Sequence, residues 1–334
     1  MHSSWNACRA RSCAALATIA TGSILAVAAA APALAQAWPT KTVRIIVPFS
    51  AGSATDIIPR TVFDHVSAQV GQTILIENRT GGGTTVGTSA VAKSDPDGHT
   101  ILVHSNALVT TPAVQANSPY DPVQDFSAIT PLGNVPLVLV ISPDKNIKTL
   151  KDLVAAAKAK PGSINYAAAG IGTPPHLTME RFRLAAGFEG QLVPFRGAPE
   201  ALTEVMTGRV DVYFCPITPA MPFIRDGKLL ALAVSSSKRA SALPNVPTTV
   251  EAGYPDSDFD FWIGMFVPKK TPRDIVARIH QETVNALEDP GVKDKLAKLG
   301  VEPLIMTPEA FDARIAKEAP IAVALAKAAG IAVK

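Results

Sequence analysis

Residues 43–70 read as a buried strand, a short polar loop and an amphipathic helix, and this junction constrains the fold more than any other feature. The apolar run Val43–Val47 is typical of a mostly buried β-strand. After the loop 48–56, apolar residues recur at helical spacing as far as Val70. Such a loop presents backbone N–H groups and the positive end of a helix dipole above the strand. The junction is therefore predicted to hold an anion.

The alternation of short apolar runs with helical segments continues along the chain, which predicts an α/β architecture with mostly parallel sheets. Two extended crossings, near 135–141 and 258–267, separate the outer parts of the chain from its middle. We expect a first, discontinuous domain of residues 36–137 and 260–334 and a second domain, residues 138–259, inserted into it. Two crossings permit rotation about a hinge, with a cleft between the domains.

The first 35 residues have the pattern of a signal peptide. Arg9 and Arg11 form a short basic region, an uncharged Ala-rich stretch covers 14–31, and Ala33-Leu34-Ala35 offers a cleavage site. A membrane anchor is the alternative, but the stretch lacks the Leu and Ile density of a stable membrane span. We expect export to the periplasm, with cleavage near Ala35 and a soluble product.

Composition excludes several classes of partner. Of the 31 basic residues, two lie in the expected leader, and the remainder nearly balance the 28 acidic ones. This balance argues against nucleic acid and gives no polybasic patch for a membrane surface. Cys215 is the one cysteine left after cleavage, so no internal disulfide is expected. Scattered histidines without a CxxC pair predict neither a metal site nor a cofactor.

Ligands of open α/β sheets bind beyond the carboxyl ends of the strands. Three loops are expected there: 48–56, Ser105-Asn106 and 168–176. Glycines in the third loop allow positive φ and close approach to a ligand. Candidate ligand-binding residues on these loops are Phe49, Ser50, Gly52, Ser53, Ala54, Thr55, Asp56, Asn106, Ala169, Gly170, Gly172 and Thr173.

Three more candidates each have a structural alternative. His176, in the first turn of a helix, hydrogen-bonds either a ligand or a neighbouring part of the fold. Arg196 meets a second carboxylate or forms a surface salt bridge. Asp211 lies at a strand start, where it either caps a turn or serves the site. Gly81-Gly82-Gly83 lacks the ending of a phosphate-binding loop and is interpreted as a flexible turn.

Several stretches together resemble the periplasmic solute receptors of tripartite tricarboxylate transporters, also called Bug-type receptors. They run in family order across nearly the whole chain after the leader. The segments that carry the resemblance are 38–60, 77–81, 92–98, 119–126, 160–162, 193–197 (Val-Pro-Phe-Arg-Gly), 208–212 (Gly-Arg-Val-Asp-Val), 231–234 and 243–248 (Leu-Pro-Asn-Val-Pro-Thr).

The resemblance implies a type II, two-domain Venus-flytrap fold, no catalysis, and a monomer that delivers its ligand to membrane transporter subunits. It also implies that loops 49–56 and 168–173 of the two domains hold one carboxylate of a small ligand, helped by ordered water. Asp56 is expected to cap its helix and orient water, because a carboxylate repels another carboxylate. A sensor for a two-component system has the same fold and is the alternative function.

The chain departs from the family pattern at the predicted site. Ser50, Ala51, Gly52 and Ser53 stand where two prolines and two glycines are usual, and 167–169 is Ala-Ala-Ala where serine is common. These changes predict a less polar distal pocket and leave the carboxylate unnamed. An exported hydrolase is a third function, but the sequence displays no nucleophile paired with a base, and Cys215 has no nearby His.

Overall fold

A computed structural model describes residues 38–331. Its contacts separate residues up to Thr40 from a compact unit that begins at Lys41, and the following concerns that unit. The expected signal peptide and its cleavage point lie outside the described residues. None of the helices within this described part has the length and apolar character needed to cross a membrane.

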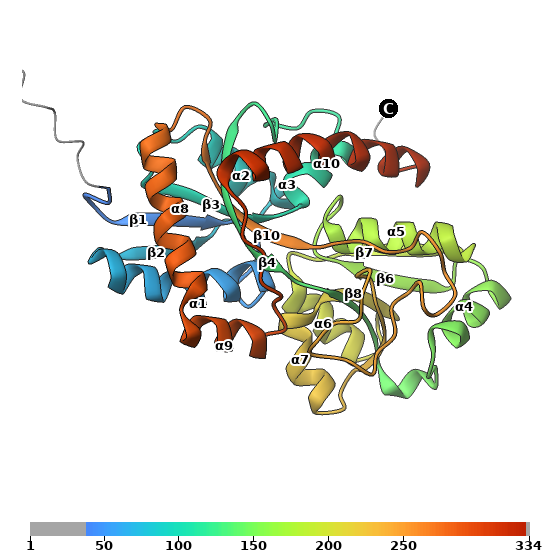
Figure 1. Cartoon of the computed structure of the whole chain (residues 1–334). Coiled ribbons are helices and arrows are strands. Elements are labelled where there is room, and N and C mark those ends of the chain that lie inside the picture. Colours follow the sequence, from blue (N-terminus) through green and yellow to red (C-terminus); the bar gives the residue numbers. More distant parts are fainter. Residues whose placement is uncertain (1–37, 332–334) are drawn as a thin grey trace, which may run out of the picture. The chain divides into compact units, whose positions relative to one another are not determined.

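Two five-stranded sheets organise the unit, and their strand orders follow the same pattern (Figure 1). The first sheet has the order β2-β1-β3-β10-β4, with β1 Val43–Val47, β2 Ile74–Asn78, β3 Thr100–Ser105, β4 Phe126–Asn134 and β10 Trp262–Pro268. The second has the order β7-β6-β8-β5-β9, with β5 Leu137–Ile141, β6 Ile164–Ala168, β7 Gly190–Pro194, β8 Val212–Pro216 and β9 Leu230–Val234. In each sheet one strand, β10 or β5, is antiparallel to both neighbours. The mixed α/β prediction is confirmed.

The chain passes from one sheet to the other twice, between β4 and β5 and between β9 and β10. On entering the first sheet, β10 pairs Ile263 with Ser105 at the carboxyl end of β3. On entering the second, β5 pairs Leu137 with Pro216 at the carboxyl end of β8. The crossings therefore bring the carboxyl edges of the two sheets to the same region. The expected domain boundaries at 137/138 and 259/260 stay a prediction.

Helices divide between the two sheets, and each sheet with its helices is called a lobe below. The first lobe has α1 Ala54–Val70, α2 Thr85–Ala92, α3 Ala107–Thr110, α8 Arg273–Glu288, α9 Pro290–Lys298 and α10 Pro308–Ala328. The second lobe has α4 Leu150–Ala159, α5 Pro174–Ala186, α6 Ala198–Met206 and α7 Ile217–Arg225. α1 and α8 pack against each other, and α10 packs on β4 and α3.

The sequence did not separate β4 from the following run. β4 contains Pro131 and Gly133, residues that usually argue against a strand interior. The structure accommodates them at irregularities in the pairing with β10, where the register shifts around Gly264. α7 was missed for a related reason, because Pro219 and Pro222 lie within it.

An aromatic cluster closes the core of the first lobe. Trp262 is fully buried, and its ring lies 5.1 Å from that of Phe311 in an edge-to-face arrangement. Phe311 also contacts Phe266, at 5.2 Å between centroids. Gly264 lies beneath this ring, since a Cβ there would come 2.5 Å from Phe311 Cζ. Trp262 packs at the crossing, as the sequence suggested, and ties α10 to β10.

Replacing Phe311 by Ala should lower the free energy of unfolding by about 3–5 kcal/mol, because it leaves a cavity under a buried ring. Urea unfolding followed by circular dichroism measures this loss. Val323→Ala is the matched control on the same helix, since Val323 is 52% exposed, and it should change stability by no more than about 0.5 kcal/mol. Equal effects of the two substitutions would contradict the packing described.

Candidate functional site

The loop between β1 and α1 is held open by a glycine and a carboxylate. Gly52 has φ +80°, a conformation that other residues rarely adopt. Its N–H donates to Asp56 Oδ2 at 2.9 Å. Ser53 occupies the N-cap position with an extended backbone, but its hydroxyl makes no capping hydrogen bond. The acidic side chain in the first turn therefore fixes the loop, and the serine at the cap does not.

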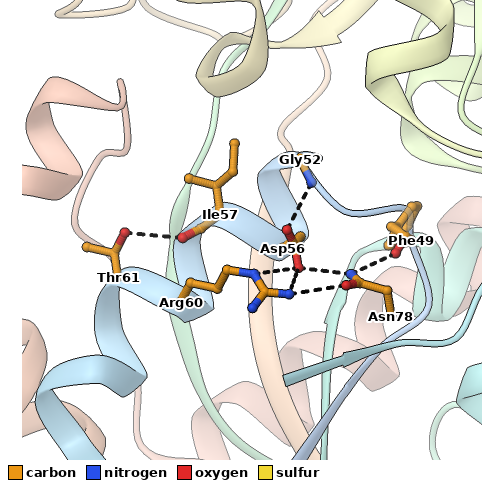
Figure 2. A network of polar contacts seen from close by, with 7 residues as sticks. All are labelled: Phe49, Gly52, Asp56, Ile57, Arg60, Thr61 and Asn78. Carbon is orange, nitrogen blue, oxygen red and sulfur yellow. Dashed lines mark hydrogen bonds and ion pairs between the residues drawn. The ribbon is translucent and has the colours of Figure 1, made fainter. Parts of the chain in front are cut away.

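Asp56 is the centre of the polar network in Figure 2. Its Oδ1 accepts from Arg60 Nη2 at 2.8 Å and from Asn78 Nδ2 at 2.9 Å. Asn78, at the end of β2, also donates to the carbonyl of Phe49 at 3.1 Å. Burial alone raises the pKa of Asp56, but the hydrogen bonds from Arg60, Gly52 and Asn78 together outweigh it and lower the pKa. An ionised carboxylate, neutralised by Arg60, thus ties the loop to its helix and to β2.

Hydrogen-bond donors remain available at this junction. Ala54 and Thr55 are the first two residues of α1, and their N–H groups find no acceptor within residues 38–331. The hydroxyls of Ser50 and Ser53 are buried and likewise have no partner there. Two amides at a helix N-terminus and two hydroxyls form a neutral set of donors suited to an anion.

Phe49 is positioned by a residue that the sequence did not single out. The ring of His104, at the carboxyl end of β3, lies 5.5 Å from that of Phe49, nearly perpendicular to it. His104 is fully buried, and burial lowers its pKa to about 3, so the ring is neutral. Its Nδ1 lies 3.0 Å from the carbonyl of Ser105. An apolar-looking strand therefore carries a polar ring directly under the loop.

The loop between β6 and α5 differs from the first in its donors. Gly170 and Gly172 have φ +112° and +79°, and Thr173 Oγ1 donates to the Gly170 carbonyl at 2.8 Å. α5 begins with Pro174 and Pro175, which have no N–H, so this helix offers fewer amides than α1. Among the described residues, the amides of Gly170 and Ile171 have no hydrogen-bond acceptor.

The two lobes touch at glycines. A Cβ on Gly197 would lie 1.8 Å from Ser50 Oγ, and one on Gly52 would lie 3.3 Å from Pro199 Cγ. The β1–α1 loop is thus pressed against the start of α6. A Cβ on Gly83 would lie 3.2 Å from the Ile171 carbonyl. The start of α2 meets the β6–α5 loop in the same way.

A groove of about 620 Å³ lies where the starts of α2, α5 and α6 converge. Arg196 lines it, and the guanidinium has no acidic partner in the part of the chain that the structure describes. The other lining residues are Gly82, Gly83, Thr85, Gln115, Gly170, Ile171, Pro194, Phe195 and Glu200. The segment 82–85 was interpreted from sequence as a flexible turn. Its position after β2, a third strand-to-helix junction, was the signal that would have placed it here.

Three other predicted site residues lie apart from these donors. Asn106 Nδ2 donates to the Asp260 carbonyl at 2.9 Å, beside a separate cavity of about 220 Å³. His176 Nδ1 accepts from the Gly172 N–H at 3.1 Å, the structural alternative given above. Asp211 accepts from Lys145 Nζ at 2.7 Å and from the Asn165 N–H at 2.8 Å.

Asp211 precedes β8 and so lies at the opposite end of the strand from the carboxyl edge. We therefore leave it out of the candidate site. Cys215, in contrast, lies near the carboxyl end of β8 but is fully buried, and burial raises the pKa of its thiol well above the usual value. A neutral, enclosed thiol is a poor nucleophile.

Replacing Asp56 by Asn should cost about 1–3 kcal/mol of stability at pH 7, because Arg60 loses its charged partner. The folded pKa of Asp56 is lower than the 3.8 of an unperturbed carboxyl. Its contribution is therefore complete above the unfolded pKa and is lost as the pH falls towards the folded one. Urea unfolding of both proteins at several pH values should show the difference shrinking below about pH 3.8.

Asp294→Asn serves as the control for this substitution, since Asp294 forms an exposed i,i+4 pair with Lys298. It should change stability by no more than about 0.5 kcal/mol. A difference between wild type and Asp56→Asn that grows on acidification would contradict the assignment.

Comparison with known proteins matches this arrangement to one family. The model of the tripartite tricarboxylate transporter family receptor matches residues 58–330. BugT of Bordetella pertussis is 33% identical over 291 residues, which cover 86% of this chain and 89% of BugT. The solved periplasmic binding protein BugD superimposes with a TM-score of 0.83 at 31% identity, covering 89% of this chain and all of BugD.

Two solved relatives contain ligands. A Rhodopseudomonas palustris protein with adipate has a TM-score of 0.85 and 30% identity, and the match covers 88% of this chain and 99% of that one. MatC from the same species, with bound malate, has a TM-score of 0.82 and 29% identity, covering 86% and 99%. The expected periplasmic-binding-protein fold is confirmed. The chain belongs to the tripartite tricarboxylate transporter receptors, a family of periplasmic solute-binding proteins.

Proposed function

We propose that the chain is an exported receptor that captures a small organic carboxylate between its two lobes and delivers it to the membrane subunits of a tripartite tricarboxylate-type transporter. Periplasmic localisation with cleavage near Ala35 belongs to this proposal. The observation that carries it is the set of unpartnered amides and hydroxyls at the β1–α1 loop, set opposite the glycine-rich loops of the second lobe.

The carboxylate would bind at the start of α1. The amides of Ala54 and Thr55 and the hydroxyls of Ser50 and Ser53 supply neutral donors, and the helix dipole adds a favourable field. The charge of Asp56 is balanced by Arg60 and both its oxygens are engaged, so it supports the loop without competing for the anion. The amides of Gly170 and Ile171 would complete the site from the second lobe.

A second negative group of the ligand would meet Arg196. This side chain is the one cation lining the groove of the described residues. A ligand that contacts both lobes favours their closed arrangement by the free energy of the contacts it gains on closure. Relatives solved with adipate and malate support a dicarboxylate as the first ligand to test.

Thermal-shift assays followed by calorimetry on the full chain test the function. The panel contains monocarboxylates, dicarboxylates including adipate and malate, tricarboxylates, amino acids and aromatic acids, with neutral sugars as controls. Saturable binding of at least one carboxylate is expected. Binding of a neutral sugar without a response to any carboxylate would overturn the proposal.

Ser53→Asp should abolish carboxylate binding, because it places a charge at the start of α1. Two like charges about 4 Å apart near a protein surface repel by about 4 kcal/mol, roughly a thousandfold in affinity. Asp is a favourable N-cap, so the fold should remain intact. Ser53→Asn is the matched control, with the same size and capping ability but no charge. Unchanged affinity in Ser53→Asp would place the anion elsewhere.

Gly197→Ala should weaken ligand binding by about tenfold, because the new methyl group meets the Ser50 hydroxyl and opposes closure. Gly197 has φ −179°, which alanine also adopts, so the effect is steric. Ser50→Gly removes both atoms of Ser50 that the methyl group would meet, and the double variant should bind as Ser50→Gly does. Calorimetry gives the affinities. A double variant as weak as Gly197→Ala would show that this contact does not limit closure.

A further inference from the structure

His176 lies beneath the β6–α5 loop. The side chain is almost fully buried, and its Nδ1 accepts a hydrogen bond from the Gly172 N–H at 3.1 Å. The ring stacks on Tyr166 of β6, with centroids 6.3 Å apart and planes 19° from parallel. Packing on the strand therefore fixes the ring, and the ring in turn fixes one amide of the loop.

The hydrogen bond requires a neutral imidazole, because a protonated Nδ1 cannot accept. Burial is the main cause that lowers the pKa of His176, and Arg183 adds to it, while Glu180 acts in the opposite direction. Glu180 is engaged by Arg183 at 2.6 Å and by the hydroxyl of Tyr166. The neighbouring charges thus neutralise each other and leave the ring uncharged at neutral pH.

Gly172 is also where the second lobe meets the first. A Cβ on it would lie 2.3 Å from Val114 Cγ2 and 3.0 Å from Thr111 Cα, just after α3. Its φ of +79° needs a partner that holds it, and α5 cannot supply the usual amides because it begins with two prolines. His176 is the partner that holds Gly172 in this conformation.

We propose that His176 is a positioning residue: it holds the Gly172 amide, so that the amides of Gly170 and Ile171 face the ligand and Gly172 seats against Thr111 and Val114. The proposal rests on the carboxylate-receptor function given above. His176 does not touch the ligand in this scheme. Its effect on affinity passes through the backbone of the loop.

Two substitutions separate this role from simple packing. His176→Phe keeps a ring that stacks on Tyr166 but removes the acceptor. His176→Asn loses the ring but places its Oδ1 where Nδ1 lies, which restores the acceptor. Affinity is measured by calorimetry with adipate or malate, whichever binds the wild type more tightly. We expect His176→Phe to lose about tenfold or more and His176→Asn to recover most of it.

A purely structural role predicts the reverse order, because Phe fills the buried space better than Asn. Wild-type affinity in His176→Phe, or no recovery in His176→Asn, would therefore overturn the proposal. Absence of carboxylate binding by the wild type would refute the proposed function instead.

Hydrogen exchange of the wild-type protein gives a measurement that does not depend on ligand binding or on folding of the variants. The Gly172 amide should be protected, and the Gly170 and Ile171 amides should exchange faster and gain protection with a bound ligand. A Gly172 amide that exchanges as fast as those of its two neighbours would contradict the proposed hydrogen bond.

Discussion

The double passage of the chain between the sheets is the constraint from which the site follows. Each crossing strand enters its new sheet at the carboxyl edge and runs antiparallel to the strands beside it. Every parallel strand of both sheets therefore ends near the crossings, and the loops that follow are brought together. Helices that start after those strands direct their N-termini to the same region. The position of the site is thus a property of the topology, before any side chain is considered.

Side chains then decide what the loops offer. Asp56 is ionised and buried, yet it faces Arg60 and Asn78 and leaves the amides of α1 free. His104 and His176 are both neutral because burial lowers the pKa of each, and both support loops from below. The donors near the crossings are consequently neutral groups held in place by charged or aromatic ones. Such preorganised donors bind an anion without the desolvation cost of an unpaired buried cation.

The sequence predicted the fold well where local patterns were strong. Val43–Val47 and Leu230–Val234 were predicted with the bounds that the structure has. β4 was missed because its proline and glycine contradict strand propensity, and only the bulged pairing with β10 explains them. At the site, the β1–α1 loop was identified from its position between a strand and a helix. The contact between Ser50 and Gly197 joins two distant parts of the chain, so no local pattern predicted it.

The two prolines that open α5 have a consequence for the order of events in binding. A ligand arriving at the open receptor finds most of its donors on one side, at the start of α1, and few on the other. It therefore settles on the first lobe, and the second lobe arrives later as a cover. Since the cover contributes few polar contacts, its closure is only weakly driven, and the lifetime of the complex is governed by how often the cover lifts. Such a receptor trades retention for ready release.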